Sequence, residues 1–164
     1  MSPFLTFLFC LNTLIYQAPE LPEWAEQQFK PLSETFERSY QLSPSILQYD
    51  LNSDDFSDIA MFVTKKENGK TGILFLINGH ENQYFLAGAG NSFGPGDNDY
   101  EWADTWQIFE EKATYEMTFL PNGDIDGERR VVLQNPAISI REDEGSGGLI
   151  YFNGSKFVWI HQGD

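Results

Sequence analysis

The chain has 164 residues, a formal net charge of −15 and 15 % aromatic residues. This length is enough for one domain with its own hydrophobic core, and the aromatic content favours β-structure. The strong negative charge repels nucleic acid and anionic membrane surfaces, so it argues against both as partners and favours cations or a basic protein.

The N-terminal segment resembles a secretory signal peptide. Residues 1–16 contain no charged side chain, and the apolar stretch is too short to span a membrane comfortably. Cys10, the only cysteine, lies here, so a protein cut near residues 16–18 has no thiol for a disulfide or a thiolate metal site. The sequence predicts a signal peptide over residues 1–18, one domain over 19–164 and a periplasmic or secreted location, with no membrane insertion after cleavage. The alternatives are an uncleaved anchor and a wrongly assigned start codon.

Residues 22–40 carry the pattern of a helix. Ala25, Phe29, Leu32 and Phe36 recur at spacings of four, three and four, which places them on one helical face. Pro31 cannot donate a backbone hydrogen bond inside a helix. We therefore expect either a kink at this residue or two short helices that meet there.

From about residue 45 the pattern changes to short apolar or alternating segments separated by turns. Asn-Gly pairs at 68–69 and 153–154 are typical of tight hairpin turns. The predicted strands are 45–51, 59–64, 71–78, 83–87, 115–119, 129–134, 137–141 and the two arms of a hairpin over 149–160; residues 102–109 form a strand or a short helix. The predicted fold class is α+β, with an N-terminal helical segment packed on a twisted antiparallel β-sheet built as a meander of hairpins.

A long loop, residues 88–100, separates two of these segments. Loops of this length are often functional. Residues 97–104 combine acidic and aromatic side chains, a mixture that suits recognition of a sugar or a basic protein. The alternative is a solvated loop that Trp102 anchors in the core, and we favour it.

An acidic loop at residues 50–58 is the most informative stretch. Asp50, Asn52, Asp54 and Asp58 alternate so that their side chains can project to one side, and the carbonyl of Phe56 falls between the last two. Ca²⁺ takes six to eight oxygen ligands from carboxylates, carbonyls and water. The spacing therefore predicts a calcium site with these five residues as ligands.

The loop is not an EF-hand, because its sixth position is Asp55 rather than Gly and its twelfth is Met61 rather than Glu. It resembles the calcium loops of FG-GAP and VCBS-type repeat proteins, which lie between two β-strands. The resemblance covers about residues 47–64, one copy where those families carry several, and it does not imply a propeller. It implies that the Asp and Asn side chains named above ligate Ca²⁺ and that residues 59–63 form the outgoing strand.

The whole chain is also similar to small exported bacterial proteins that carry one such loop and end in a hairpin with an Asn-Gly turn. That similarity implies no activity. The alternative interpretation of the loop needs no ion, because Asp and Asn side chains cap local turns through their own oxygens. Asp55 stands where such calcium loops have a glycine in a left-handed conformation, and Asn52 replaces a carboxylate.

No catalytic constellation is evident. His80 and His161 are the only histidines, and neither has a metal-ligand partner at a standard spacing, so each is interpreted as a surface or turn residue. We expect a non-enzymatic, exported binding or accessory protein of the bacterial envelope with a structural Ca²⁺, whose partner is a basic protein or a glycan. One alternative is an acidic inhibitor or immunity-type protein against a basic secreted enzyme. Another is a small glycan-active hydrolase.

Overall fold

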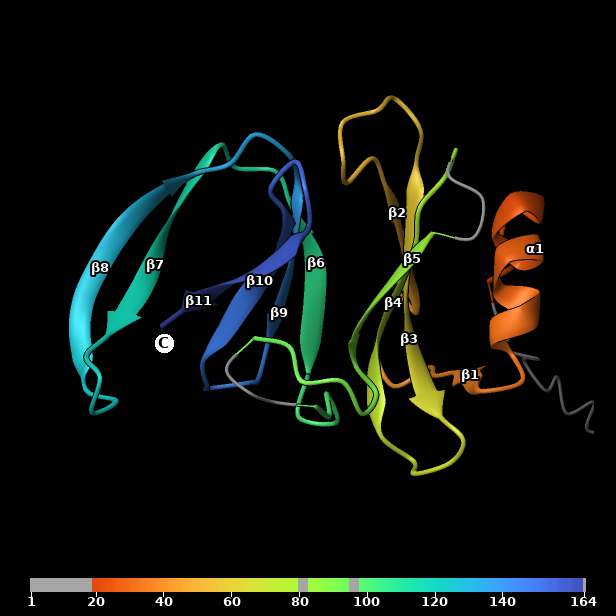
Figure 1. Cartoon of the computed structure of the whole chain (residues 1–164), viewed down its shortest axis with the longest axis horizontal. Coiled ribbons are helices and arrows are strands. Elements are labelled where there is room, and N and C mark those ends of the chain that lie inside the picture. Colours follow the sequence, from red (N-terminus) through yellow and green to blue (C-terminus); the bar gives the residue numbers. More distant parts are fainter. Residues whose placement is uncertain (1–18, 80–82, 95–97, 164) are drawn as a thin grey trace, which may run out of the picture.

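In the described part of the chain, the fold is a stack of antiparallel sheets with one helix on its outside (Figure 1). The computed structural model describes residues 19–79, 83–94 and 98–163. The predicted signal peptide, His80 and Asp97 lie outside the described residues. The prediction of a domain rich in antiparallel β-structure with a short helical segment is confirmed, although the strands form three sheets rather than one.

The first sheet, sheet A, contains five strands. They are β1 (Phe36–Arg38), β2 (Ile46–Tyr49), β3 (Asp58–Lys65), β4 (Thr71–Leu76) and β5 (Tyr84–Gly88). β4 pairs with one edge of β3, and both β1 and β2 pair with the other, in the registers Phe36↔Lys65 and Ile46↔Met61. β1 and β2 thus pair with successive parts of the same edge of β3, in the place that one long strand would otherwise occupy.

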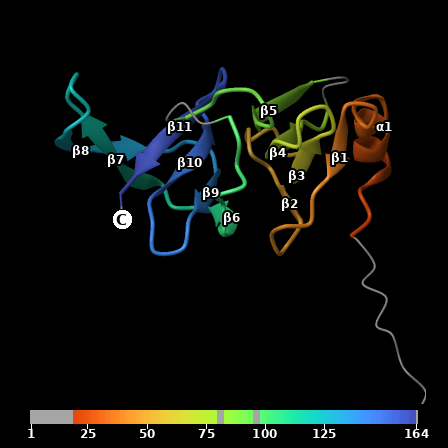
Figure 2. The ribbon, with the colours of Figure 1, turned by 90° about the horizontal axis from the view of Figure 1, so that it is seen from below.

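The other strands form a four-stranded sheet B and a two-stranded sheet C. Sheet B has the order β11-β10-β9-β6, from β6 (Thr105–Phe109), β9 (Ala137–Arg141), β10 (Gly147–Phe152) and β11 (Phe157–Gln162). Sheet C is the hairpin of β7 (Ala113–Phe119) and β8 (Ile125–Val132). Figures 1 and 2 show α1, sheet A, sheet B and sheet C as successive layers.

Among the described residues, three clusters of buried apolar side chains fill the spaces between these layers. The central core, between sheets A and B, includes Phe62 and Phe75 from sheet A and Trp106 from sheet B. The helix-side core joins Ala25 and Phe29 of α1 (Glu23–Leu32) to the opposite face of sheet A. The hairpin-side core lies on the outer face of sheet B and consists of Leu133, Ala137, Leu149, Tyr151 and Ile160, with Val131 of β8 packed against it.

Burial on both faces explains the continuous apolar run of β3. Successive side chains of a strand point to opposite faces. Ala60 and Phe62 belong to the central core, whereas Ile59, Met61 and Val63 belong to the helix-side core. A strand covered on both faces has no position that requires a polar side chain, so its sequence does not alternate.

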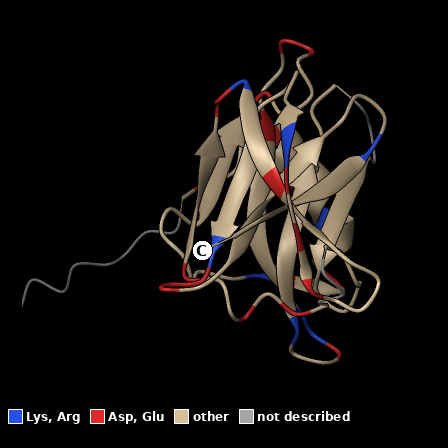
Figure 3. Cartoon of the chain, turned by 90° about the vertical axis from the view of Figure 1, so that its left-hand side faces the viewer, with Lys and Arg blue, Asp and Glu red and all other residues tan. Residues whose placement is uncertain are grey.

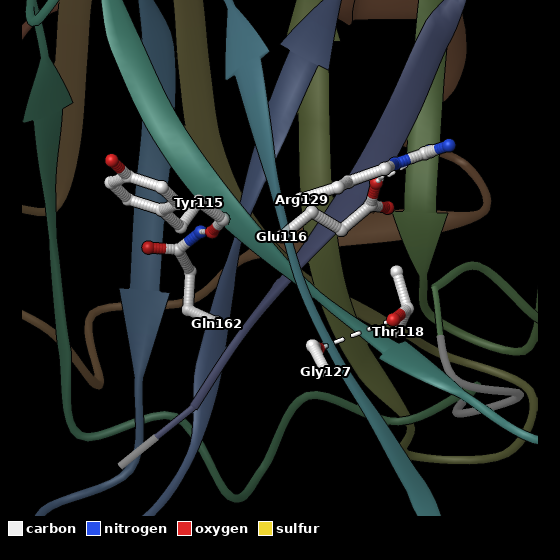
Figure 4. Close-up of polar contacts among 6 residues, drawn as sticks. All are labelled: Tyr115, Glu116, Thr118, Gly127, Arg129 and Gln162. Carbon is white, nitrogen blue, oxygen red and sulfur yellow. Dashed lines mark hydrogen bonds and ion pairs between the residues drawn. The ribbon is translucent and has the colours of Figure 1, made fainter.

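Sheet C is attached to sheet B through side chains. Gln162 of β11 donates from Nε2 to the carbonyl of Tyr115 on β7 at 2.7 Å (Figure 4). Within the hairpin, Thr118 donates to the carbonyl of Gly127 at 3.2 Å, and Arg129 donates from Nε to Glu116 at 2.6 Å. Seen from this side, acidic positions lie in the loops at both ends of the strands (Figure 3).

The prediction of helix across residues 22–40 is wrong beyond Leu32. Pro31 lies in the last turn, and the helix closes with Ser33 donating its N–H to the carbonyl of Phe29 at 2.9 Å. Residues 36–38 form β1 instead, and Phe36 is still buried in the helix-side core. Pairing with β3 supplies the backbone hydrogen bonds that a helix interrupted by proline cannot.

The predicted hairpin turns are confirmed. Gly69 and Gly154 both adopt left-handed backbone angles, with φ of 73° and 92°. The segment predicted as a strand or a short helix is a strand over residues 105–109. In the part of the chain that the structure describes, no helix is both long and apolar enough to cross a membrane.

Candidate functional site: the acidic loop

The acidic loop connects β2 to β3 at one edge of sheet A, where it brings a carboxylate into the protein interior. Asp58 is the first residue of β3 and is 0 % exposed. Its Oδ2 accepts the backbone N–H of Leu51 at 3.0 Å, and its Oδ1 accepts that of Asn78 at 3.0 Å. One carboxylate therefore ties the beginning of the loop to the chain just beyond β4.

The electrostatic environment of Asp58 shows that other acidic groups lie close to it. The pKa of this carboxyl is raised from the usual 3.8 to about 6, chiefly by burial and to a smaller extent by the charges of Asp54 and Asp50, and this value already includes the opposing effect of the two backbone hydrogen bonds. Burial disfavours the ionised form because the carboxylate loses its hydration. The negative side chains of this loop are thus crowded together.

This shift predicts a pH dependence of stability. Between pH 3.8 and about 6 the folded protein holds a proton on Asp58 that the unfolded chain has released. Stability falls as pH rises wherever the folded state binds more protons, so we expect Asp58 to add to the free energy of unfolding as the pH is lowered from 7 to 4. Urea unfolding at several pH values should show a shallower dependence in Asp58→Asn than in the wild type. Equal slopes would contradict the expectation.

The remaining predicted ligands are joined by hydrogen bonds within the loop. Asp50 accepts the N–H of Asp54 at 3.2 Å and that of Asp55 at 2.9 Å, one on each carboxylate oxygen. Asn52 accepts the N–H of Asp54 at 3.1 Å and donates from its amide to the Asp54 carboxylate at 2.9 Å. Asp54 in turn accepts the N–H of Phe56 at 2.9 Å. These side chains therefore perform the turn-capping role of the ion-free interpretation.

Hydrogen bonds thus join the side chains of three predicted ligands, Asp50, Asn52 and Asp54, whereas the Asp58 carboxylate bonds to Leu51 and Asn78 instead. Phe56, the fifth, donates its N–H to the loop and has a side chain that is 56 % exposed. Across the described residues, no group of three or more His, Cys, Asp or Glu side chains is arranged to hold a metal ion. The calcium site stays a prediction.

Two loop residues adopt left-handed backbone angles without being glycine. Ser53 has φ of 60° and Asp55 has φ of 71°. Asp55 is the position where the calcium loops that this stretch resembles have a glycine. An L-residue with a Cβ is disfavoured there by contact with the backbone, although Asp tolerates it better than most.

We expect Asp55→Gly to raise the free energy of unfolding by about 0.5–1 kcal/mol, because glycine adopts this angle without steric cost. The Asp55 side chain is exposed, so its removal creates no cavity. Asp55→Asn is the matched control, since it removes the same charge and keeps the Cβ. Equal gains in both variants would assign the effect to charge and not to the backbone.

Other acidic and aromatic positions have structural roles. Trp102 packs against the central core, as we favoured, and its ring centroid is 5.6 Å from that of Tyr100. Asp99, which sequence reasoning did not single out, accepts hydrogen bonds from the N–H and hydroxyl of Thr71 at 2.9 and 3.1 Å and so fixes the long loop to β4. His161 is half-buried within strand β11, with its ring against Phe119, so it does not lie in a turn.

A cavity that sequence reasoning missed lies beside the acidic loop. It has a volume of about 790 Å³, and Asn52 of the loop forms part of its wall. Most of the other lining residues come from β5 and from the last hairpin. No local pattern places these two segments together, because their proximity depends on how sheet A meets sheet B.

Comparisons with known proteins identify no relative of the chain. No family model matches the chain, and no curated protein or solved structure matches it.

Proposed function

We propose that the chain is an exported, non-catalytic binding or accessory protein of the bacterial envelope, and that its acidic loop holds a structural Ca²⁺. The observation that supports this is the crowding of Asp50, Asn52 and Asp54 around a loop that ends in a fully buried carboxylate. A divalent ion at this place would neutralise charges that otherwise repel one another.

The donor chemistry fits a hard cation. The ligands would be the side-chain oxygens of Asp50, Asn52, Asp54 and Asp58 and the carbonyl of Phe56, all oxygen donors of the kind that Ca²⁺ prefers. A backbone N–H occupies only one acceptor position, and an ionised carboxylate offers about four. The capping hydrogen bonds of the loop are therefore compatible with an ion as well.

The role of such an ion would be structural. It would connect the end of β2 to the start of β3 and would compensate for the burial of Asp58. The resemblance to FG-GAP and VCBS-type loops supports the same assignment. In the proposed α+β fold, the helical segment packs on the face of sheet A that points away from sheet B. Nothing in this arrangement requires an enzymatic step.

The test is thermal unfolding of EDTA-treated protein with and without added Ca²⁺. For an extracellular-type affinity of about 10⁻⁴ to 10⁻³ M, 10 mM Ca²⁺ adds about 1.4–2.7 kcal/mol of stability. We therefore expect the melting temperature to rise by about 3–10 °C.

Two variants with equal charge make this test specific. Asp54→Ala removes a proposed ligand and should abolish the rise, whereas Asp126→Ala removes an exposed acidic side chain of β8 and should keep it. The calcium assignment fails if the wild type shows no rise while folded, or if both variants respond equally.

The net charge of −15 supports a second candidate, an acidic inhibitor or immunity-type protein that binds a basic secreted enzyme. Capture of partners from envelope extract should be repeated at low and high salt. Retrieval of one basic enzyme with steep salt dependence would favour the inhibitor, because screening weakens attraction between opposite charges. Retrieval that is insensitive to salt would count against it.

A further inference from the structure

The cavity beside the acidic loop has the size and lining of a small-molecule site. Its volume of about 790 Å³ falls within the range of about 300–1,000 Å³ that such sites occupy. It lies where β5 of sheet A approaches the last hairpin of sheet B. Ligand sites are commonly clefts lined mainly by apolar and aromatic side chains, with a few polar groups that orient the ligand.

Aromatic rings form the apolar wall of the cavity. Five of its lining residues are aromatic. The rings of Phe85 and Phe157 are stacked, with centroids 4.7 Å apart and an angle of 16° between their planes, and Phe93 meets Phe85 edge-on at 5.0 Å. Phe152 packs against Phe157 with centroids 5.3 Å apart. Mutual packing holds these half-buried rings in place, so they form an ordered surface for a flat or aliphatic group.

The polar side chains that line the cavity, as far as the described residues go, include one charged group. Lys156 is the only charged residue among the described residues that line it, and the other lining residues with polar groups are Asn52, Gln83, Tyr84 and Ser155. No carboxylate lies within ion-pair distance of the Lys156 ammonium in the described part of the chain. In a chain with a net charge of −15, an exposed lysine that lines an apolar cavity provides a local attraction for an anion.

We propose that this cavity binds a small amphipathic anion, with an aromatic or aliphatic body against Phe85 and Phe157 and one carboxylate or sulfonate head group at Lys156. This deepens the binding role proposed above, on which it rests, by naming the class of ligand. A glycan would need more directed hydrogen bonds than this mostly apolar wall provides, and a basic group would be repelled by Lys156.

Two fluorescent probes with the same body separate the two parts of the proposal. 8-Anilinonaphthalene-1-sulfonate carries an anionic head, and N-phenyl-1-naphthylamine has the same ring system without it. We expect saturable binding of the sulfonate with one site per chain, tighter than binding of the neutral probe. Titrations are done in EDTA on folded full-length protein, so that they do not depend on calcium.

Matched variants locate the site. Lys156→Gln should weaken binding of the sulfonate about tenfold and leave the neutral probe unchanged, because a charge-assisted hydrogen bond is worth about that factor. Lys112→Gln makes the same change in charge at an exposed lysine outside the cavity lining and should alter neither probe. Gln83→Trp replaces an exposed side chain at the cavity wall with a large one and should weaken both probes at least tenfold.

Several results would overturn the proposal. Equal affinities for the two probes, or equal effects of Lys156→Gln and Lys112→Gln, would refute the anionic head group. Unchanged binding in Gln83→Trp would place the probes on another apolar surface, such as the exposed Tyr115, Ile125 and Val132 of sheet C. Any of these failures would leave the calcium-dependent rise in melting temperature intact, whereas failure of that rise would leave probe binding unaffected.

Discussion

Phe62→Ala is expected to lower the free energy of unfolding by about 3–5 kcal/mol, the usual cost of removing a buried phenylalanine ring. Phe62 is 1 % exposed, and its ring meets that of Trp106 edge-on with centroids 4.9 Å apart. The pair joins β3 of sheet A to β6 of sheet B in the central core. The loss should be measured as a shift in the urea unfolding midpoint, with circular dichroism to confirm that the variant folds.

Phe56→Ala is the matched control for this substitution. Phe56 lies six positions earlier in the chain and is 56 % exposed, so the same truncation should change stability by no more than about 0.5 kcal/mol. If the two variants lose similar stability, packing between sheets A and B does not stabilise the fold in the way described. A loss confined to Phe62→Ala supports it.

Asp58→Ala is expected to cost about 2–4 kcal/mol, because it leaves the N–H groups of Leu51 and Asn78 without their acceptor. Removal of a buried charge offsets part of this loss at neutral pH. Asp58→Asn keeps one carbonyl oxygen as an acceptor and removes the charge, so it should lose about half as much. Urea unfolding in EDTA at pH 7 measures both variants without a contribution from calcium.

The ranking of these two variants tests the role of the side chain. If Asp58→Ala were as stable as Asp58→Asn, the hydrogen bonds to Leu51 and Asn78 would not contribute, and the burial of Asp58 would have no structural reason. The result also bears on the calcium proposal. A variant that unfolds at lower urea even without metal shows that Asp58 organises the loop before any ion binds.

The strands could be predicted from the sequence because their signals are local. The apolar run at 59–64 and the Asn-Gly pairs each specify a strand or a turn within a few residues. The sequence predicts a helix that is too long for an equally local reason, because Phe36 fits the spacing of the helical face as well as it fits a buried position in β1. Only the pairing of residues 36–38 with β3, which is a long-range contact, distinguishes the two.

The division into three sheets and the cavity could not be predicted, because both depend on contacts between distant segments. Phe85 and Phe157 stack across sheets A and B, and no periodicity in either strand records that contact. The spacing of its acidic residues identifies the loop in the sequence, but nothing in that spacing predicts that Asp58 is buried. Its role as an acceptor for Asn78 depends on where β4 ends beside it.

The arrangement of β1 and β2 along one edge of β3 has a consequence for aggregation. The run Ile59–Val63 is the kind of segment that pairs with copies of itself when its backbone is accessible. Here β4 covers one edge of it, β1 and β2 pair with the two ends of the other edge, and Ser39 donates its N–H to the carbonyl of Phe62 between them. Because the cover is divided in two, detachment of β1 alone would uncover only the end of β3 near Val63, and the centre of the run would stay protected against self-association.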